Sequence, residues 1–200
     1  MTDSPESLRD RTRREVRRQI AQAATGLFVQ QGFEATTVDQ IAAQTGISRR
    51  SFFRYFASKE DVVVGELADR GAIVAAALAE RPAEESPWDA MKAALLELQA
   101  SMRVSDEMEL EFGRILYDTP SLRARHLEKQ LSWQELLVPI MAERVRAADP
   151  DSAIEPELAA AAIVVASLTC LDVAGEHWIQ QNGAVSLERL YDDAVAAVRS

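Results

Sequence analysis

The residues with the clearest chemical potential form one short basic segment near the N-terminus of this 200-residue chain. It reads Arg-Arg-Ser-Phe-Phe-Arg-Tyr-Phe over residues 49–56. A guanidinium can bridge O6 and N7 of guanine, a serine hydroxyl can bond either base edge, and an aromatic ring can contact a thymine methyl. On a helix, Phe52 and Phe56 lie four residues apart and face inward. The opposite side then presents the candidate base-reading residues Arg49, Arg50, Ser51, Phe53 and Arg54.

Three further residues stand where they could hold the phosphate backbone. Thr37 and Lys59 lie at two expected helix starts, where free backbone N–H groups favour an anion. Tyr55 can add a hydrogen bond from its hydroxyl to a phosphate. A plain helical hairpin with a solvated basic face is the alternative interpretation of the same pattern.

Two short helices must position the basic segment. Thr37 can cap the first of them, and Gly46 supplies a residue that tolerates positive φ after its end. Ser48 can cap the second, over about residues 49–55. The spacing also lets three apolar side chains share a small core, namely Ile41, Ile47 and Phe52. The pattern therefore indicates a helix-turn-helix.

Helical periodicity runs through the rest of the chain, and no segment alternates with period two over a useful length. Apolar residues recur at three- and four-residue steps over about 12–31, and Ser58 can cap a helix that reaches about Glu80. After a proline-containing break at 81–87, further helices are expected to begin at Ser86, Ser105, Thr119, Glu157 and Ser186. The sequence predicts an all-α fold.

The charge is unevenly distributed, which bears on the partner of the N-terminal part. The chain carries a net charge of −10, yet its first 60 residues hold ten Lys and Arg against seven Asp and Glu. Charges are screened beyond about 8 Å at physiological salt, so a basic face can act locally. Arginines in the opening segment can lie along phosphates or enter a minor groove; a solubilising terminus is the alternative. These are Arg9, Arg11, Arg13, Arg14, Arg17 and Arg18.

Composition and residue inventory exclude several function classes. Hydrophobic residues make up 48% and charged residues 27% of the chain, which is typical of a globular protein. The lone Cys170 leaves no pair for a disulfide or a cysteine-ligated cluster. With two histidines and no glycine-rich phosphate loop, we expect no enzyme, no catalytic residue, no metal and no cofactor. A helical adaptor that binds only protein is the alternative, but it leaves Arg49 and Arg50 unexplained.

No segment is expected to direct the chain to a membrane. The first 18 residues carry charges of both signs and no apolar stretch, unlike a signal peptide. The longest uncharged apolar run, residues 158–171, is shorter than the stretch of about 18 residues that spans a bilayer. We therefore expect a cytoplasmic protein with no membrane partner.

Four consecutive motifs lie at 36–43, 46–48, 52–56 and 58–61, and together they resemble the N-terminal domain of the tetracycline-repressor (TetR) family over about residues 12–62. The resemblance implies a dimeric DNA-binding regulator of nine or so helices, with a C-terminal domain that binds a small molecule. Phe53 departs from the family, which usually has Tyr there, so its role shifts to apolar base contact or packing. The resemblance implies DNA roles for Thr37, Arg49, Arg50, Ser51, Phe53, Tyr55 and Lys59.

The expected organisation has three parts. A flexible basic arm over 1–11 precedes a three-helix helix-turn-helix domain over 12–60, and a helical bundle for ligand binding and dimerisation follows over 61–200. The basic segment is also similar to that of family members with a C-terminal domain of an acyl-CoA-binding type. We therefore expect a repressor that binds a palindromic operator and is released by a small, largely apolar, acyl-CoA-like effector, with activation as the alternative output.

Effector pockets in helical bundles lie between helices and are mostly apolar. His126 could be a polar handle for the effector, and Asp172 and Glu176 could bind a cationic ligand or pair across a dimer. A satisfied histidine and a solvated helix edge are the alternatives for these three. The candidate lining residues, each alternatively plain core, are Trp88, Met91, Leu95, Met102, Met108, Phe112, His126 and Trp133.

The helix expected from Glu157 to Gln181 is apolar nearly all round, so it should be buried on every side. One face can be hidden in its own bundle, and the other then needs a partner; a monomer with a central buried helix is the alternative. Pairing this helix and the last one with their two-fold mates gives an isologous four-helix interface. The candidate interface residues are Val164, Leu168, Leu171, Leu190 and Tyr191.

Overall fold

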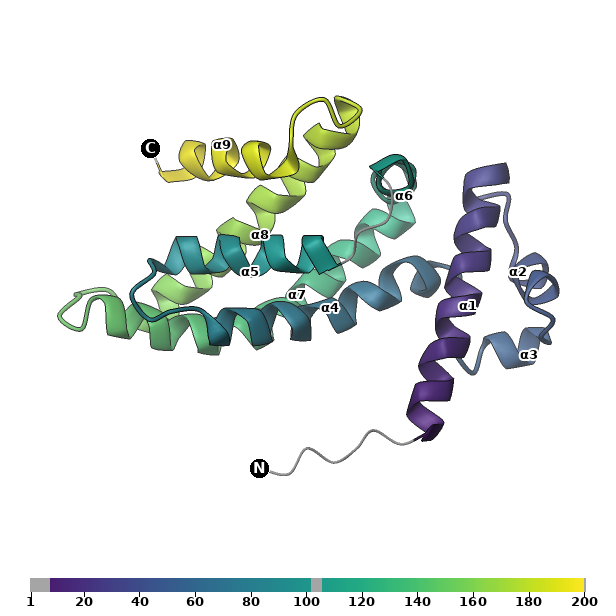
Figure 1. The fold of residues 1–200 in the computed structure, drawn as a ribbon, viewed down its shortest axis with the longest axis horizontal. Coiled ribbons are helices and arrows are strands. Elements are labelled where there is room, and N and C mark those ends of the chain that lie inside the picture. Colours follow the sequence, from purple (N-terminus) through teal and green to yellow (C-terminus); the bar gives the residue numbers. More distant parts are fainter. Residues whose placement is uncertain (1–7, 102–105, 200) are drawn as a thin grey trace.

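The computed structural model describes residues 8–101 and 106–199, and all regular secondary structure within these ranges is α-helical. The predicted all-α fold class is confirmed. Figure 1 shows α1 to α3 gathered at one end and the other helices forming an elongated bundle. The helices are α1 (Leu8–Gln31), α2 (Val38–Gln44), α3 (Arg49–Phe52), α4 (Glu60–Glu80), α5 (Pro87–Ser101), α6 (Asp106–Asp118), α7 (Pro120–Ala148), α8 (Pro156–Gln180) and α9 (Leu187–Arg199).

The local signals at the helix ends act as the sequence predicted. Gly32 has φ +86° after α1, and Gly46 has φ +68° after α2, a backbone region that glycine adopts without steric cost. Two boundaries differ from expectation. The first helix begins at Leu8, so the described part of the expected arm is helical. α3 ends at Phe52, and the chain continues through a turn to Tyr55.

The core of the N-terminal helices extends into the bundle. Phe52 is fully buried, and it packs with side chains of α1, α2 and the start of α4. Leu116 of α6 and Leu122 of α7 belong to the same cluster, so the hydrophobic core of the helix-turn-helix does not close at residue 60. Two bundle helices are thereby packed directly against α1, α2, α3 and the start of α4, which we call the head. The principal members are Ile20, Phe28, Ile41, Phe52, Phe56, Val64, Leu116 and Leu122.

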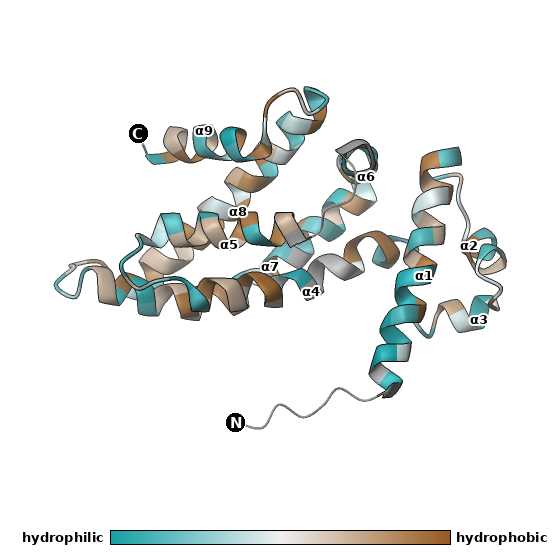
Figure 2. Cartoon of the chain, in the orientation of Figure 1, coloured by the Kyte–Doolittle hydropathy of each residue, from teal (hydrophilic) through white to brown (hydrophobic). Residues whose placement is uncertain are grey.

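A second core fills the bundle, in which α4 packs against α7, α7 against α8, and α8 against α9. Figure 2 shows several hydrophobic segments along α4 and a run of mostly hydrophilic residues on the lower half of α1. α4 and α7 approach closely at Gly71, where an added Cβ would lie 2.6 Å from the Trp133 ring. Glycine at this position therefore sets the distance between the two helices.

α8 is the most apolar helix of the described chain. By length and composition alone it could cross a membrane, because an 18-residue window has a mean hydropathy of 2.0. The run counted from the sequence was shorter because it stopped at Asp172. The core helix of a bundle has the same composition, and α8 packs against α5, α6, α7 and α9.

The positions proposed for the dimer interface lie mainly inside the chain. Val164 and Leu168 point into the bundle core, and Tyr191 of α9 is equally buried there. Leu171 and Leu190 are half-buried against the same core. The sequence of an all-apolar helix does not show which of its faces packs into its own bundle. In this structure, the face that contains these residues packs there. A partner would have to use the remaining face of α8.

Candidate functional site

Two capped helices build the helix-turn-helix. The Thr37 hydroxyl accepts a hydrogen bond from the Gln40 backbone N–H at 3.2 Å, and the Gln40 side chain accepts one from the Thr37 N–H at 2.8 Å. This reciprocal capping box fixes the start of α2. Ser48 caps α3 in the same way, since its Oγ accepts from the Ser51 N–H at 3.1 Å. Both caps were predicted from the sequence.

The two faces of α3 separate as expected. Phe52 and Phe56 are buried, and their ring centroids lie 5.7 Å apart. On the outer side, Arg49, Arg50 and Arg54 are exposed and Ser51 is half-buried. The Phe53 ring is 45% exposed, so it is free to contact an apolar base edge. The segment thus presents three guanidinium groups, a hydroxyl and a ring on one accessible surface.

Arg49 differs from the other arginines because a carboxylate holds it. Its Nη1 donates to Oδ2 of Asp39 on α2 over 2.8 Å, and its guanidinium carbon lies 5.8 Å from the centre of the Phe53 ring. Both charged side chains are 62% exposed. The contact joins the two helices of the helix-turn-helix across their outer surface. Sequence reasoning did not pair these residues.

Lys59 has a structural contact that its expected phosphate role did not include. Its Nζ donates to the backbone oxygens of Phe33 at 2.6 Å and Thr36 at 3.0 Å, and it lies 4.1 Å from the centre of the Phe33 ring. An ammonium has three N–H donors, so one remains for a phosphate. Lys59 therefore ties the start of α4 to the loop before α2.

Arg17 positions the far end of the basic segment, a role that the sequence did not suggest. Its Nη1 donates to the Tyr55 carbonyl at 2.7 Å, and its guanidinium carbon lies 4.6 Å from the centre of the Phe56 ring. A Cβ added at Gly65 would lie 3.3 Å from its Nη2. Arg17 thus links α1, the turn after α3, and α4. It is half-buried, whereas Arg13, Arg14 and Arg18 on α1 are exposed.

The structure does not bring the expected effector-lining residues to one cavity. Met91, Leu95 and Trp133 are buried in the bundle core, whereas Phe112 packs against the core of the N-terminal helices. Met102 lies outside the described residues, as does the side chain of Met108. Trp88 lines a different feature, an open depression of about 370 Å³ between α5 and α9.

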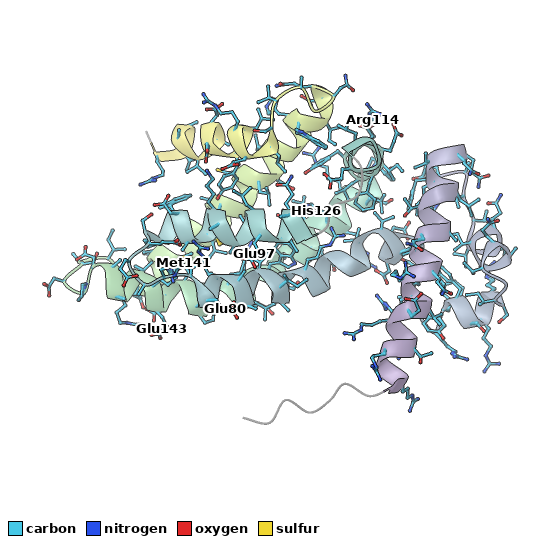
Figure 3. The ribbon with its side chains drawn as sticks, in the orientation of Figure 1. Glu80, Glu97, Arg114, His126, Met141 and Glu143 are labelled. Atoms are coloured by element: carbon cyan, nitrogen blue, oxygen red, sulfur yellow. The ribbon has the colours of Figure 1, made fainter. Side chains whose placement is uncertain are left out.

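His126 lies in a polar cluster between α6, α7 and α8. Its Nε2 lies 2.7 Å from Oδ1 of Asp172 on α8, and the side-chain nitrogen of Gln130 lies 3.2 Å from the same Nε2. The Tyr117 hydroxyl on α6 donates to the same Asp172 oxygen at 3.3 Å. The other ring nitrogen of His126, Nδ1, is buried and has no hydrogen-bond partner in the described chain. Figure 3 labels His126 on α7 and Arg114 on α6.

Burial and charge shape the electrostatics of this cluster. Burial, helped by the adjacent Asp172 carboxylate, raises the pKa of Tyr117 far above its usual range, so the hydroxyl stays neutral and can donate. Glu176 forms an ion pair with Arg123 at 3.3 Å, so its carboxylate already has a cation. A Cβ added at Gly175 would lie 2.7 Å from the Tyr117 oxygen, so Gly175 leaves room for the tyrosine. The sequence singled out His126 and Asp172 but missed Tyr117 and Gln130.

The described residues offer little for catalysis. Burial raises the pKa of the Cys170 thiol, which disfavours the nucleophilic thiolate. Within residues 8–101 and 106–199, no group of three or more His, Cys, Asp or Glu could hold a metal ion.

Two family models match the chain. Residues 20–64 match the model described as bacterial regulatory proteins of the tetR family. Residues 85–200 match the model described as the MftR C-terminal domain. Together they cover the helix-turn-helix and most of the bundle.

Relatives and solved structures agree with these models. TcmR of Streptomyces glaucescens, an HTH-type transcriptional regulator, is 35% identical over 72% of this chain and 66% of its own length. MftR of Mycobacterium tuberculosis is 28% identical over 86% of this chain and 83% of its own; its name assigns it to regulating mycofactocin biosynthesis. The crystal structure of FadR from Bacillus subtilis with stearoyl-CoA has a TM-score of 0.59 at 19% identity, covering 90% of this chain and 95% of that one. The matched relatives are transcriptional regulators rather than enzymes or protein-binding adaptors.

Proposed function

The chain belongs to the TetR family of bacterial regulatory proteins, and from that premise we propose that it binds a palindromic operator as a homodimer and is released by a small effector. As a family member it is a DNA-binding transcriptional regulator. We propose repression as its output and the cytoplasm as its location.

The exposed outer face of α3 is the observation that best supports operator binding. Arg49 and Arg50 on α3, and Phe53 directly after it, are exposed, whereas Phe52 on the opposite side is buried in the head. Helix-turn-helix proteins place such a helix in the major groove, where arginine reads guanine and apolar groups contact thymine. Thr37, Lys59 and Tyr55 then hold the flanking phosphates. The proposed domain division at residue 60 follows the start of α4, although α6 and α7 complete the core of the head.

The homodimer is supported by a stripe of small and apolar residues on the outer face of α8. Leu158 is 63% exposed, and Val165 and Val173 are 42% and 44% exposed. They recur at helical spacing, so they lie on the side of α8 opposite its buried residues. A two-fold axis beside α8 would pack this stripe against its own copy. The stripe comprises Leu158, Ala162, Val165, Thr169 and Val173.

We propose that the effector has an apolar body and one polar end. The buried unpartnered Nδ1 of His126 and the Tyr117 hydroxyl form a polar anchor at the boundary between the bundle and the head. Met91, Leu95 and Trp133 are the apolar candidates in the bundle. FadR of Bacillus subtilis holds stearoyl-CoA, so an acyl-CoA is the first class to test. Glu176 is not part of the anchor because it already pairs with Arg123.

Contacts between the bundle and the head give the effector a physical route to α3. Tyr117 joins the polar cluster through its hydroxyl, while Leu116, the residue before it, is buried in the core of the head. Leu122 of α7, four residues before His126, is in that core as well. A ligand that moves α6 or α7 would therefore move the head. The coupling required is of the order of 1–3 kcal/mol.

Selection from a random-sequence duplex library tests the operator. We expect enrichment of a palindrome whose half-sites lie about one helical turn apart, about 34–36 Å. Arg50→Ala should then relax selectivity at one base position by about 1–3 kcal/mol. Equal losses on every sequence would mean that Arg50 contacts only phosphate, and no enrichment would reject sequence-specific binding.

Titration with stearoyl-CoA, using coenzyme A without an acyl chain as the control, tests the effector class. We expect the acylated molecule alone to release the selected duplex. Release by neither compound would reject an acyl-CoA effector while leaving the operator proposal standing.

A further inference from the structure

We propose that Asp39 determines specificity, because it holds Arg49 in position to read a base and keeps it from the phosphate backbone. Asp39 lies in the first turn of α2, outside the set of residues assigned to DNA contact above. The inference rests on the proposed operator binding. It assigns to an acidic residue a positive role in an interface that otherwise depends on cations.

The geometry holds the Arg49 guanidinium from two sides. Nη1 is bonded to the Asp39 carboxylate at 2.8 Å, and the Phe53 ring lies beside the group at 5.8 Å between the guanidinium carbon and the ring centre. Asp39 is itself well positioned, because it sits on the capped first turn of α2. Arg49 is the first residue of α3, where recognition helices contact base edges.

A guanidinium has five N–H donors in a fixed fork, so the bond to Asp39 leaves donors free for guanine O6 and N7. An exposed arginine with no partner loses rotamer freedom when it binds, whereas one already held loses less. The carboxylate also cancels the charge that would draw Arg49 to the nearest phosphate. Asp39 therefore opposes non-specific binding, which depends on phosphates neutralised by cations.

Arg50 provides the internal contrast. It is also exposed on α3, yet it makes no hydrogen bond or ion pair with another side chain of the described residues. No side chain of the described residues therefore orients it in advance. The structure thus separates the neighbouring arginines into one that is positioned in advance and one that is not.

The test compares affinity for the selected duplex with affinity for a random duplex of equal length. Asp39→Asn removes the charge while keeping similar size, and Glu84→Ala is the control, because Glu84 is an exposed acid in the loop between α4 and α5. We expect Asp39→Asn to bind the random duplex more tightly and to lower the affinity ratio by about ten-fold, within the range that one arginine–guanine pair supplies. Its salt dependence should steepen by about 0.9 per phosphate gained.

A double-mutant cycle with Arg49→Ala separates positioning from simple charge removal. Arg49→Ala should lower the ratio alone, and adding Asp39→Asn should lower it no further. Asp39→Glu, which keeps the carboxylate, should restore part of the ratio. Unchanged melting temperatures across the series would show that the effects arise in DNA recognition rather than folding.

The outcomes distinguish this inference from the proposed function. If the wild-type chain selects a duplex but Asp39→Asn discriminates equally well, Asp39 has no role in specificity. Additive effects of Asp39→Asn and Arg49→Ala on the ratio would likewise overturn the positioning role. If the wild-type chain prefers no sequence, the operator proposal fails and this inference fails with it.

Discussion

The imidazole Nε2 of His126 on α7 lies 2.7 Å from the carboxylate Oδ1 of Asp172 on α8, and Tyr117 of α6 donates to the same oxygen at 3.3 Å. One carboxylate oxygen thus joins three helices. α6 and α7 also carry Leu116 and Leu122 into the core of the head. Two of the three helices that meet in this cluster therefore also pack against the N-terminal helices.

Replacing Asp172 by Ala should destabilise the chain by about 1–3 kcal/mol, because it leaves two half-buried polar partners, His126 and Tyr117, without this carboxylate oxygen. Asp172→Asn keeps one acceptor oxygen and should cost less. The free energy of unfolding from urea titration measures both. Asp151→Ala, at an exposed position in the α7–α8 loop, is the matched control and should change little. Equal stability of Asp172→Ala and wild type would show that the cluster does not hold the helices together.

Two tyrosines, one half-buried and one buried, predict a loss of stability in alkali. Burial is the largest cause of the raised pKa of Tyr117 and of Tyr191. Their folded pKa lies above the unfolded value of about 10, so the stability they contribute is present below that pH and is lost as pH rises above it. The unfolding free energy should therefore be constant up to about pH 9 and fall as the pH rises above the unfolded value of about 10. Tyr117→Phe should reduce this slope; an unchanged slope would mean that other groups cause it.

Gly113 allows α6 to approach α8 closely. A Cβ added there would overlap Cδ1 of Ile179 and lie 2.9 Å from its Cγ1. Gly113→Ala should therefore lower the melting temperature despite the better helix propensity of alanine. Ile179→Ala should relieve the clash. The double variant should therefore lose less stability than the sum of the losses of the two single variants.

Gly26 supplies the control for this substitution. It also lies within a helix, but a Cβ added there meets nothing within 4 Å. Gly26→Ala should therefore stabilise the chain by about 0.5–1 kcal/mol. If Gly113→Ala gave the same gain, the α6–α8 contact would be looser than the structure has it.

The outer stripe of α8 predicts where a charge breaks the dimer. Val165→Asp should convert the dimer to a monomer, because two carboxylates would face each other across the two-fold axis. Leu131→Asp is the control: Leu131 is more exposed than Val165, at 60%, but lies on α7. Light scattering after gel filtration measures both. A dimer that survives Val165→Asp would place the interface elsewhere.

Local signals made the head predictable from the sequence. Thr37 and Gly46 act within a few residues of their own position, so the capping box and the positive φ follow from the chain alone. The bundle was less accessible, because every face of α8 is apolar and only packing shows that Val164 and Leu168 point inward. The contact between Gly71 and Trp133 joins residues 62 positions apart, which no local pattern reveals. Arg49 was singled out from the sequence, but its pairing with Asp39 depends on the angle between two helices.

We propose that two copies of this chain read one palindromic duplex. A native mass spectrum of the protein mixed with the selected duplex measures how many chains bind each duplex. We predict a complex of two chains per duplex and no comparable complex with a random duplex of equal length. A complex with one chain per duplex, or equal complex formation on both duplexes, would contradict the account.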